Sequence, residues 1–300
     1  MPTTVTPFAV DVDGLLLHGD LHLPDPDEHG APVPGIVMSH GFSATRTMGL
    51  PAFAEAFARA GFAVALYDHR CLGASEGSPR FDIDPWLQTL DMRRVLDWLE
   101  LRPEIDAGRL ALWGSSFSGG ESLVLASVDP RVRAVIANAP FAGTGGEPDP
   151  SLDAERHARI SAIVLGEAEL PERIEIGPMA VVQPAGSEDP AFLAQPESAE
   201  WFLTNGPGTG WENTFTVHFS SDPSFDPMVC MAQLAPCALM MNVATEDRVA
   251  PTATALEAFE RASEPKLLTM FEGHHFSDYS GSTRDRSIDS MIDFLRLHLA

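Results

Sequence analysis

The chain is 300 residues long and 44% of it is apolar, which is enough to build a large buried core. Its 43 acidic and 19 basic residues give a formal net charge of −24, which would repel the phosphates of nucleic acids and the headgroups of anionic membranes. The sequence shows no basic-then-apolar leader, and no apolar run approaches the ~20 residues that a membrane span needs. We therefore expect a soluble, cytoplasmic globular protein without nucleic-acid or membrane partners.

The first 24 residues predict a β-hairpin. Phe8, Val10 and Val12 alternate with polar residues, and leucines recur on the far side of the pair Asp13-Gly14. An Asp-Gly pair between two such runs is a strong hairpin signal. A polar, proline-rich loop is expected at 24–34.

From residue 35 onward, short apolar runs alternate with segments of helical spacing. Continuous apolar runs are typical of strands that are buried on both faces. Strands are expected at 35–39, 62–67, 109–114, 132–137, 237–243 and 266–271, and helices at 49–60, 86–101, 117–128, 152–168, 251–262 and 284–299. This alternation predicts an α/β fold, with a mostly parallel central sheet flanked by helices.

Residues 140–235 interrupt the alternation. They are rich in Pro, Gly, Asp and Glu, and helical spacing is visible only near 152–168. An irregular stretch of this length is unusual inside a compact domain. We expect a core formed by residues 1–139 and 236–300, with residues 140–235 inserted as a lid or cap.

A candidate nucleophile lies in residues 114–119, Gly-Ser-Ser-Phe-Ser-Gly, between a predicted strand and a predicted helix. A serine at such a turn sits on a sharp elbow that exposes its hydroxyl above the sheet, next to a helix N-terminus that favours developing negative charge. The common elbow is G-x-S-x-G, and here Ser118 occupies the last position, so that the segment fits the variant G-x-S-aromatic-x-G. Ser116 is the predicted nucleophile, and Ser115 is a rival that fits the spacing less well.

A nucleophilic serine needs a base and a carboxylate that orients the base, and both follow in the order expected for such an elbow. Asp247 lies in the loop after strand 237–243, at the edge of the sheet where active-site groups gather. Its neighbour Glu246 is the alternative. His274 and His275 follow strand 266–271, and one of them is the candidate base.

The segment after strand 35–39 provides a candidate oxyanion hole. In such an arrangement this loop and the residue after the nucleophile donate backbone N–H groups to the tetrahedral intermediate. We expect these donors to be the N–H groups of Phe42 and Phe117. Gly41 allows the loop to approach the substrate, and His40 is interpreted as packing beneath the site.

No metal site or cofactor is expected. Cys71, Cys230 and Cys237 show neither a CxxC motif nor metal-ligand spacing, which indicates buried or free thiols. The paired histidines lack a third ligand cluster at a suitable spacing.

The motifs together resemble the α/β-hydrolase superfamily over essentially the whole chain. Residues 40–42, 67–77 and 114–119 are similar to the branch that contains X-Pro dipeptidyl peptidases, cocaine-esterase-like enzymes and dienelactone-hydrolase-like proteins. Residues 67–77 resemble the family's Asp-x-Arg-Gly-x-Gly-x-Ser-Glu-Gly loop, with Cys71 where the family has Gly, and we interpret this loop as structural. Residues 273–281 resemble the His-Phe-x-x-Tyr-x-Gly ending of bacterial hydrolases and fungal polyketide transferases, which favours His275 as the base.

The resemblance implies an enzyme that forms an acyl-enzyme on Ser116 and cleaves a small-molecule ester or thioester. The alternatives are an acyltransferase of secondary metabolism that uses an alcohol or amine acceptor, and a non-catalytic ligand-binding protein of the same fold. Aromatic residues of the insertion are candidate substrate contacts, with Trp201, Phe202 and Trp211 foremost. A homodimer is an open expectation.

Overall fold

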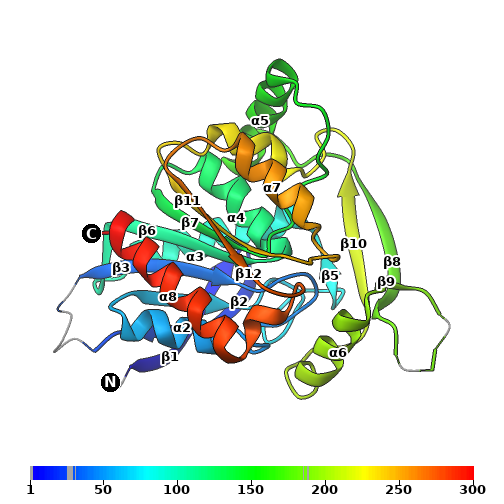
Figure 1. The fold of residues 1–300 in the computed structure, drawn as a ribbon, viewed down its shortest axis with the longest axis horizontal. Coiled ribbons are helices and arrows are strands. Elements are labelled where there is room, and N and C mark those ends of the chain that lie inside the picture. Colours follow the sequence, from blue (N-terminus) through cyan, green and yellow to red (C-terminus); the bar gives the residue numbers. More distant parts are fainter. Residues whose placement is uncertain (1–2, 26–29, 31, 185, 188) are drawn as a thin grey trace.

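Eight strands form the central sheet in Figure 1, a computed structural model that describes residues 3–25, 30, 32–184, 186–187 and 189–300. In sheet order they are β1 (Thr4–Val12), β2 (Leu15–Leu23), β4 (Ala63–Tyr67), β3 (Val33–Ser39), β6 (Ile105–Ser115), β7 (Val132–Asn138), β11 (Ala238–Ala244) and β12 (Lys266–Phe271). β2 pairs antiparallel with β1 and β4, and every other neighbouring pair is parallel. The predicted mostly parallel α/β sheet is confirmed.

The predicted hairpin at the start of the chain is confirmed as β1 and β2. Asp13 and Gly14 have φ angles of 54° and 87°, the two positive values that a type I′ turn requires. Residues 26–29 and 31 of the loop expected at 24–34 lie outside the described residues.

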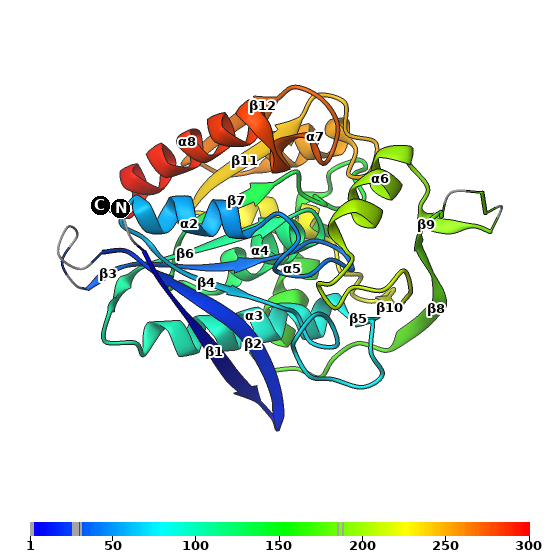
Figure 2. The ribbon, with the colours of Figure 1, turned by 90° about the horizontal axis from the view of Figure 1, so that it is seen from below.

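Helices cover both faces of the sheet (Figure 2). On one face lie α2 (Pro51–Arg59) and α8 (Gly281–His298), and on the other lie α3 (Pro85–Glu100), α4 (Phe117–Val128) and α7 (Thr252–Arg261). All seven residues of β3 are buried, with Ile36 and Met38 packed toward α2 and α8 and Val37 toward the opposite face. This two-sided burial explains why the strands read as continuous apolar runs. In the described ranges, no helix is long and apolar enough to span a membrane.

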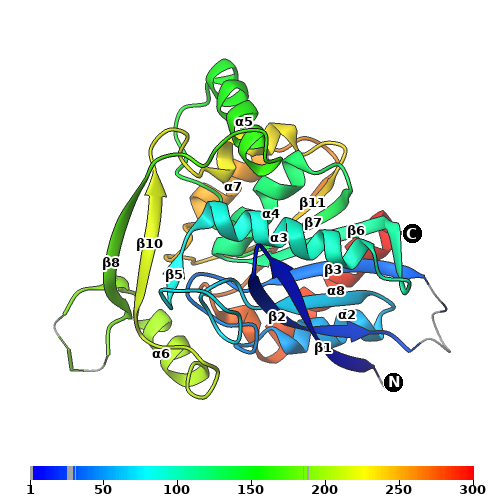
Figure 3. The ribbon, with the colours of Figure 1, turned by 180° about the vertical axis from the view of Figure 1, so that it is seen from behind.

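The insertion (residues 140–235) has more regular structure than its sequence indicated. It contains α5 (Pro150–Val164), β8 (Arg173–Val182), β9 (Ala191–Leu193), α6 (Pro196–Asn205), β10 (Phe215–Ser220) and the 3₁₀ helix η1 (Pro227–Gln233). Its strands join β5 (Asp82–Ile83) of the core in a second sheet, ordered β5-β10-β8-β9, which stands at one end of the central sheet (Figure 3). β8 was missed because most of its residues are exposed and Gly177-Pro178 interrupts its apolar pattern. β10 was missed although Phe215, Val217 and Phe219 alternate with polar residues.

Three contacts tie this second sheet to the core. β10 pairs with β5 at Val217 and Ile83, and His218 Nε2 lies 2.8 Å from Asp82 Oδ1. The guanidinium of Arg173, at the start of β8, forms an ion pair with Asp84, which is only 2% exposed. Asp84 also caps α3, because its Oδ1 accepts hydrogen bonds from the next turn of backbone N–H groups. The carboxylate of Asp84 therefore both caps α3 and anchors the insertion through Arg173.

Substituting Asp84 by Ala should destabilise the protein more than a simple loss of a helix cap. Asp149 is the matched control, because it caps α5 through two N–H groups at 3.1 Å but is exposed. We expect Asp149→Ala to lower the free energy of unfolding in urea by about 1 kcal/mol. Asp84→Ala should cost about twice as much or more, because it also leaves Arg173 without its carboxylate. Equal losses would show that the ion pair contributes nothing.

Candidate active site

Ser116 occupies the turn between β6 and α4, in a strained backbone conformation. Its φ and ψ angles are 54° and −115°, far from the regions that L-residues prefer. The turn is held by hydrogen bonds from Ser116 N to Asn138 O (2.8 Å) and from Phe141 N to Ser116 O (2.8 Å). This is the sharp elbow that the motif predicts.

Glycines allow the backbones around the elbow to approach each other. A Cβ on Gly114 would lie 2.1 Å from the carbonyl oxygen of Ser118, and a Cβ on Gly41 would lie 2.9 Å from Ser116 Cβ. Neither distance is compatible with a side chain. The loop after β3 can therefore lie directly beside the serine.

The structure brings together the three residues singled out as nucleophile, base and acid. Ser116 Oγ is 2.9 Å from His275 Nε2, and His275 Nδ1 is 2.6 Å from Asp247 Oδ2. The other oxygen of Asp247 accepts hydrogen bonds from the N–H groups of Val249 (2.9 Å) and Ala250 (2.8 Å). His275 and Asp247 are 2% and 6% exposed, so this hydrogen-bonded chain is shielded from water except at its serine end.

The rival residues lie elsewhere. Ser115 is buried and its hydroxyl pairs with Tyr279, and Glu246 is exposed. His274 accepts a hydrogen bond at Nδ1 from Phe276 N (3.3 Å). None of the three contributes to the chain from Ser116 to Asp247.

The two predicted oxyanion donors flank the serine. Phe117 begins α4, so its N–H has no partner within the helix. Among the described residues, neither Phe42 N nor Phe117 N donates to a protein acceptor, and the two rings meet edge to face with centroids 5.5 Å apart. Both N–H groups are available to a ligand at Ser116.

Comparison with known proteins places this geometry in a family. The model of the X-Pro dipeptidyl-peptidase (S15) family matches residues 13–148. The chain is 31% identical to thiohydrolase aneE of Aspergillus aculeatus, over 96% of this chain and 92% of the relative, and 30% identical to polyketide transferase grgF of Penicillium, over 96% and 95%. It is also 30% identical to the quorum-quenching protein AidA of Acinetobacter baumannii, over 88% and 86%. The crystal structure of GrgF superposes with a TM-score of 0.73 at 28% identity, covering 100% of this chain and 99% of that one.

The chain belongs to the S15 family of α/β hydrolases. Its membership of this family makes it a serine hydrolase. The predicted family resemblance and the predicted fold class are both confirmed.

The family loop at 67–77 lies under the site of this hydrolase and does not reach Ser116. Asp68 is buried and accepts hydrogen bonds from Arg46 N (2.7 Å) and Ala74 N (2.9 Å). Cys71, which stands where the family has Gly, has a φ of 64°, in the left-handed region that favours glycine. These contacts agree with the structural interpretation of the loop.

A cavity of about 30 Å³ adjoins the hydroxyl of Ser116. Its walls combine the core with the insertion, and they are almost wholly apolar. They are formed by Gly41, Phe42, Ala44, Ser116, Leu193, Trp201, Phe202, Val249, His275, Phe276 and Tyr279. Because 30 Å³ holds no more than a few waters, the space beside Ser116 is narrow in this structure.

Two of the three aromatic residues expected at the substrate line this cavity. Trp201 and Phe202 do, but Trp211 packs behind Phe202, with ring centroids 5.6 Å apart, and does not reach the cavity. Phe276 and Tyr279 were missed as wall residues, although their place beside His275 in the closing motif could have indicated them. Phe276 stacks on Trp201 with centroids 4.9 Å apart, so the loop of the base meets the insertion directly.

A second buried carboxylate near the base also escaped the sequence analysis. Asp278 is fully buried, and its Oδ2 accepts a hydrogen bond from Asn242 Nδ2 at 3.3 Å. Burial raises the pKa of Asp278 to about 6. No spacing rule marks such a residue, because its burial depends on how α8 and β11 pack.

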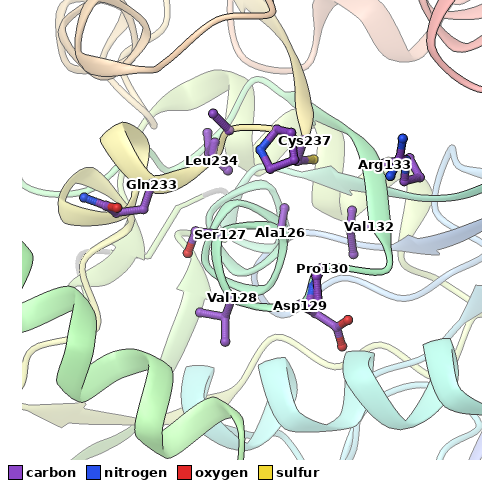
Figure 4. A pocket seen from close by; sticks show the side chains of 12 residues that line it. Ala126, Ser127, Val128, Asp129, Pro130, Val132, Arg133, Gln233, Leu234 and Cys237 are labelled. Atoms are coloured by element: carbon purple, nitrogen blue, oxygen red, sulfur yellow. The ribbon is translucent and has the colours of Figure 1, made fainter.

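Another cavity, of about 120 Å³, lies at the C-terminal end of α4, whereas Ser116 is at its N-terminal end (Figure 4). Cys237 lines it, and burial raises the pKa of this thiol to about 12, so it is not a nucleophile near neutral pH. All three cysteines are free and buried. In the described part of the chain, no group of three or more His, Cys, Asp or Glu side chains could hold a metal ion.

Proposed function

We propose that Ser116, His275 and Asp247 are a catalytic triad that cleaves a carboxylic ester or thioester through an acyl-enzyme. The observation that carries this proposal is the continuous hydrogen-bonded chain that ends at a serine on a strained elbow. Its two hydrogen bonds are 2.9 Å from Ser116 Oγ to His275 Nε2 and 2.6 Å from His275 Nδ1 to Asp247 Oδ2. Its order along the chain, Ser, Asp, His, is that of α/β hydrolases.

Acylation follows from this geometry. His275 Nε2 removes the proton of Ser116 Oγ as the oxygen attacks the acyl carbon. The carbonyl π electrons move to the oxygen, and the N–H groups of Phe42 and Phe117 stabilise the resulting oxyanion. When the tetrahedral intermediate collapses, the alcohol or thiol departs and takes its proton from His275. Water then repeats the sequence on the acyl-enzyme and releases the acid.

Asp247 orients the base and stabilises its charged form. The 2.6 Å contact fixes the proton of neutral His275 on Nδ1, which leaves Nε2 free to accept from the serine. The two backbone N–H groups on its other oxygen fix the direction of the Asp247 side chain.

The substrate class proposed is a small molecule with an apolar acyl group. The cavity walls beside Ser116 carry no charged side chain other than the triad itself, and aromatic rings from Phe42, Trp201 and Phe202 dominate them. A charged acyl group would lose its hydration there without gaining a partner.

We further propose that the insertion acts as a lid, with β9 and the start of α6 as its moving part. Phe192 of β9 is 43% exposed and stacks on Phe42 with centroids 4.8 Å apart, so it covers the proposed oxyanion loop. Phe42 also lines the narrow cavity of about 30 Å³, so separation of the two rings would widen it for an acyl group.

Acyl transfer to an alcohol or amine is the second candidate. It is favoured by the 30% identity to a protein named polyketide transferase and by the narrow apolar cavity, which leaves little room for water beside the acyl-enzyme.

Replacing Ser116 by Ala should abolish activity without unfolding the protein. We expect labelling by a fluorophosphonate, read as intact mass, to disappear and ester turnover to fall by about 10⁴-fold or more. Ser115→Ala is the matched control and should still be labelled, because Ser115 faces Tyr279. Labelling of Ser116→Ala would reject the proposed nucleophile.

Product analysis distinguishes hydrolysis from transfer. The purified chain is given an apolar acyl thioester, with and without a panel of alcohols and amines. We expect free acid as the main product under every condition. An ester or amide that forms only with an acceptor and consumes the acid yield would establish transfer instead.

Removing the ring of Phe192 should open the site. We expect Phe192→Ala to raise kcat/KM for bulky acyl esters by about 3- to 10-fold relative to short ones, because access no longer requires the Phe42 stack to separate. Phe219→Ala is the control, since Phe219 is similarly exposed (40%) on the same inserted sheet but, among the described residues, makes no ring contact with Phe42. Equal effects of the two variants would contradict the lid.

A further inference from the structure

Beneath the elbow lies a buried polar cluster that the proposed mechanism does not use. It consists of His40, His69, Ser118 and Glu121, each no more than 1% exposed. The cluster connects the first turn of α4 with the loop after β3, which carries Phe42. Its hydrogen bonds hold the peptides that set the direction of the Phe42 N–H, the proposed oxyanion donor.

His40 holds the peptide that contains this donor. Its Nε2 accepts a hydrogen bond from His69 N (3.2 Å), and its Nδ1 lies 3.0 Å from Gly41 O. A neutral imidazole has one donor and one acceptor, so the proton is on Nδ1 and is donated to Gly41 O. Burial lowers the pKa of His40, which keeps the ring neutral. Because Gly41 O and Phe42 N belong to one planar peptide, fixing the oxygen fixes the direction of the N–H.

Ser118 holds the preceding peptide. Its Oγ lies 2.5 Å from His40 O, 2.7 Å from His69 Nε2 and 2.8 Å from Glu121 Oε2. The carbonyl can only accept, so the single hydroxyl proton is donated to His40 O. The hydroxyl oxygen then accepts from His69 Nε2–H and from the protonated carboxyl of Glu121. When Glu121 is protonated, each of these three contacts of Ser118 therefore has one donor and one acceptor.

We propose that Ser118 and His40 are positioning residues, which hold the two peptides of the loop after β3 so that the Phe42 N–H points at the oxyanion formed on Ser116. This inference rests on the proposed triad. Ser118 stands where the common elbow has glycine, and its hydroxyl adds a link between nucleophile elbow and oxyanion loop that glycine cannot make.

Glu121 makes this link sensitive to pH. The groups that face it are Ser118 on its own helix, His69 after β4, Tyr67 in β4, and Asp84 and Asp91 of α3 and its cap. Burial raises its pKa to about 8, so the carboxyl is neutral below that pH. Once ionised, it becomes the strongest acceptor for the Ser118 proton, and His40 O loses its donor. The alignment of Phe42 N–H should weaken as the pH rises through about 8.

Ser118→Ala tests the positioning role. We expect kcat on an activated ester to fall by about 10- to 100-fold with KM changed by less than about threefold, because the lost alignment matters in the transition state. Affinity for a trifluoromethyl ketone, which forms an oxyanion on the serine, should fall by a similar factor. Ser122→Ala is the matched control, because Ser122 is a buried serine of the same helix whose Oγ has Met92 Sδ (3.6 Å) as its only hydrogen-bond partner among the described residues. An unchanged kcat and inhibitor affinity in Ser118→Ala, or equal losses in the control, would overturn the inference.

Glu121→Gln supplies a readout that a purely structural role would not move. The amide can donate to Ser118 as the protonated carboxyl does, but it cannot ionise. We expect the alkaline fall of kcat in the wild type near pH 8 to shift upward or vanish in Glu121→Gln. Identical alkaline limbs would reject the inference. A wild type that is neither labelled by fluorophosphonate nor active on esters rejects the triad and this inference together, whereas a labelled wild type that is indifferent to Ser118→Ala rejects the inference alone.

Discussion

The backbone of Ser116 lies in a conformation that costs on the order of 1–3 kcal/mol for a residue with a side chain, and the surroundings must hold it there. Its N–H is bonded to Asn138, the last residue of the neighbouring strand β7, and its carbonyl to Phe141, which follows that strand. The chain can come this close only where side chains are missing, at Gly41 and Gly114. The hydroxyl then stands above the sheet, and the positions of the base and of the oxyanion loop follow from it.

Parallel pairing explains why residues far apart in the sequence meet at this serine. β3, β6, β11 and β12 all run in the same direction, so the loops at their carboxyl ends gather at one edge of the sheet. These loops bring Phe42, Ser116, Asp247 and His275 together. The same arrangement places His40 and Ser118 in contact. His40 lies two residues before Phe42 in the chain, and Ser118 lies two residues after Ser116.

The insertion contributes part of the walls of the cavity beside Ser116. Its sheet is joined to the core through β5 and through the ion pair of Arg173 with Asp84, while Trp201 and Phe192 contribute rings that stack on Phe276 and Phe42. In the proposed lid, the end of the inserted sheet that is attached to the core would stay in place while these ring contacts separate. The exclusion of water also strengthens every hydrogen bond in the buried chain from Ser116 to Asp247.

The sequence by itself determined the α/β class, the hairpin and the elbow, because these depend on local patterns: continuous apolar runs, Asp13-Gly14, and small residues around Ser116. It also proposed Asp247 and His275, from their places after two strands. Only the tertiary structure shows that His275 and Asp247, and not their neighbours His274 and Glu246, form the hydrogen-bonded chain to Ser116, since neighbouring residues differ in which way the loop turns them. It alone shows how the strands of the insertion pair in one sheet with β5, and it places Trp211 behind Phe202 and outside the cavity. Contacts between distant segments, such as Ser118 with His40, have no signature in local spacing and arise when the sheet assembles.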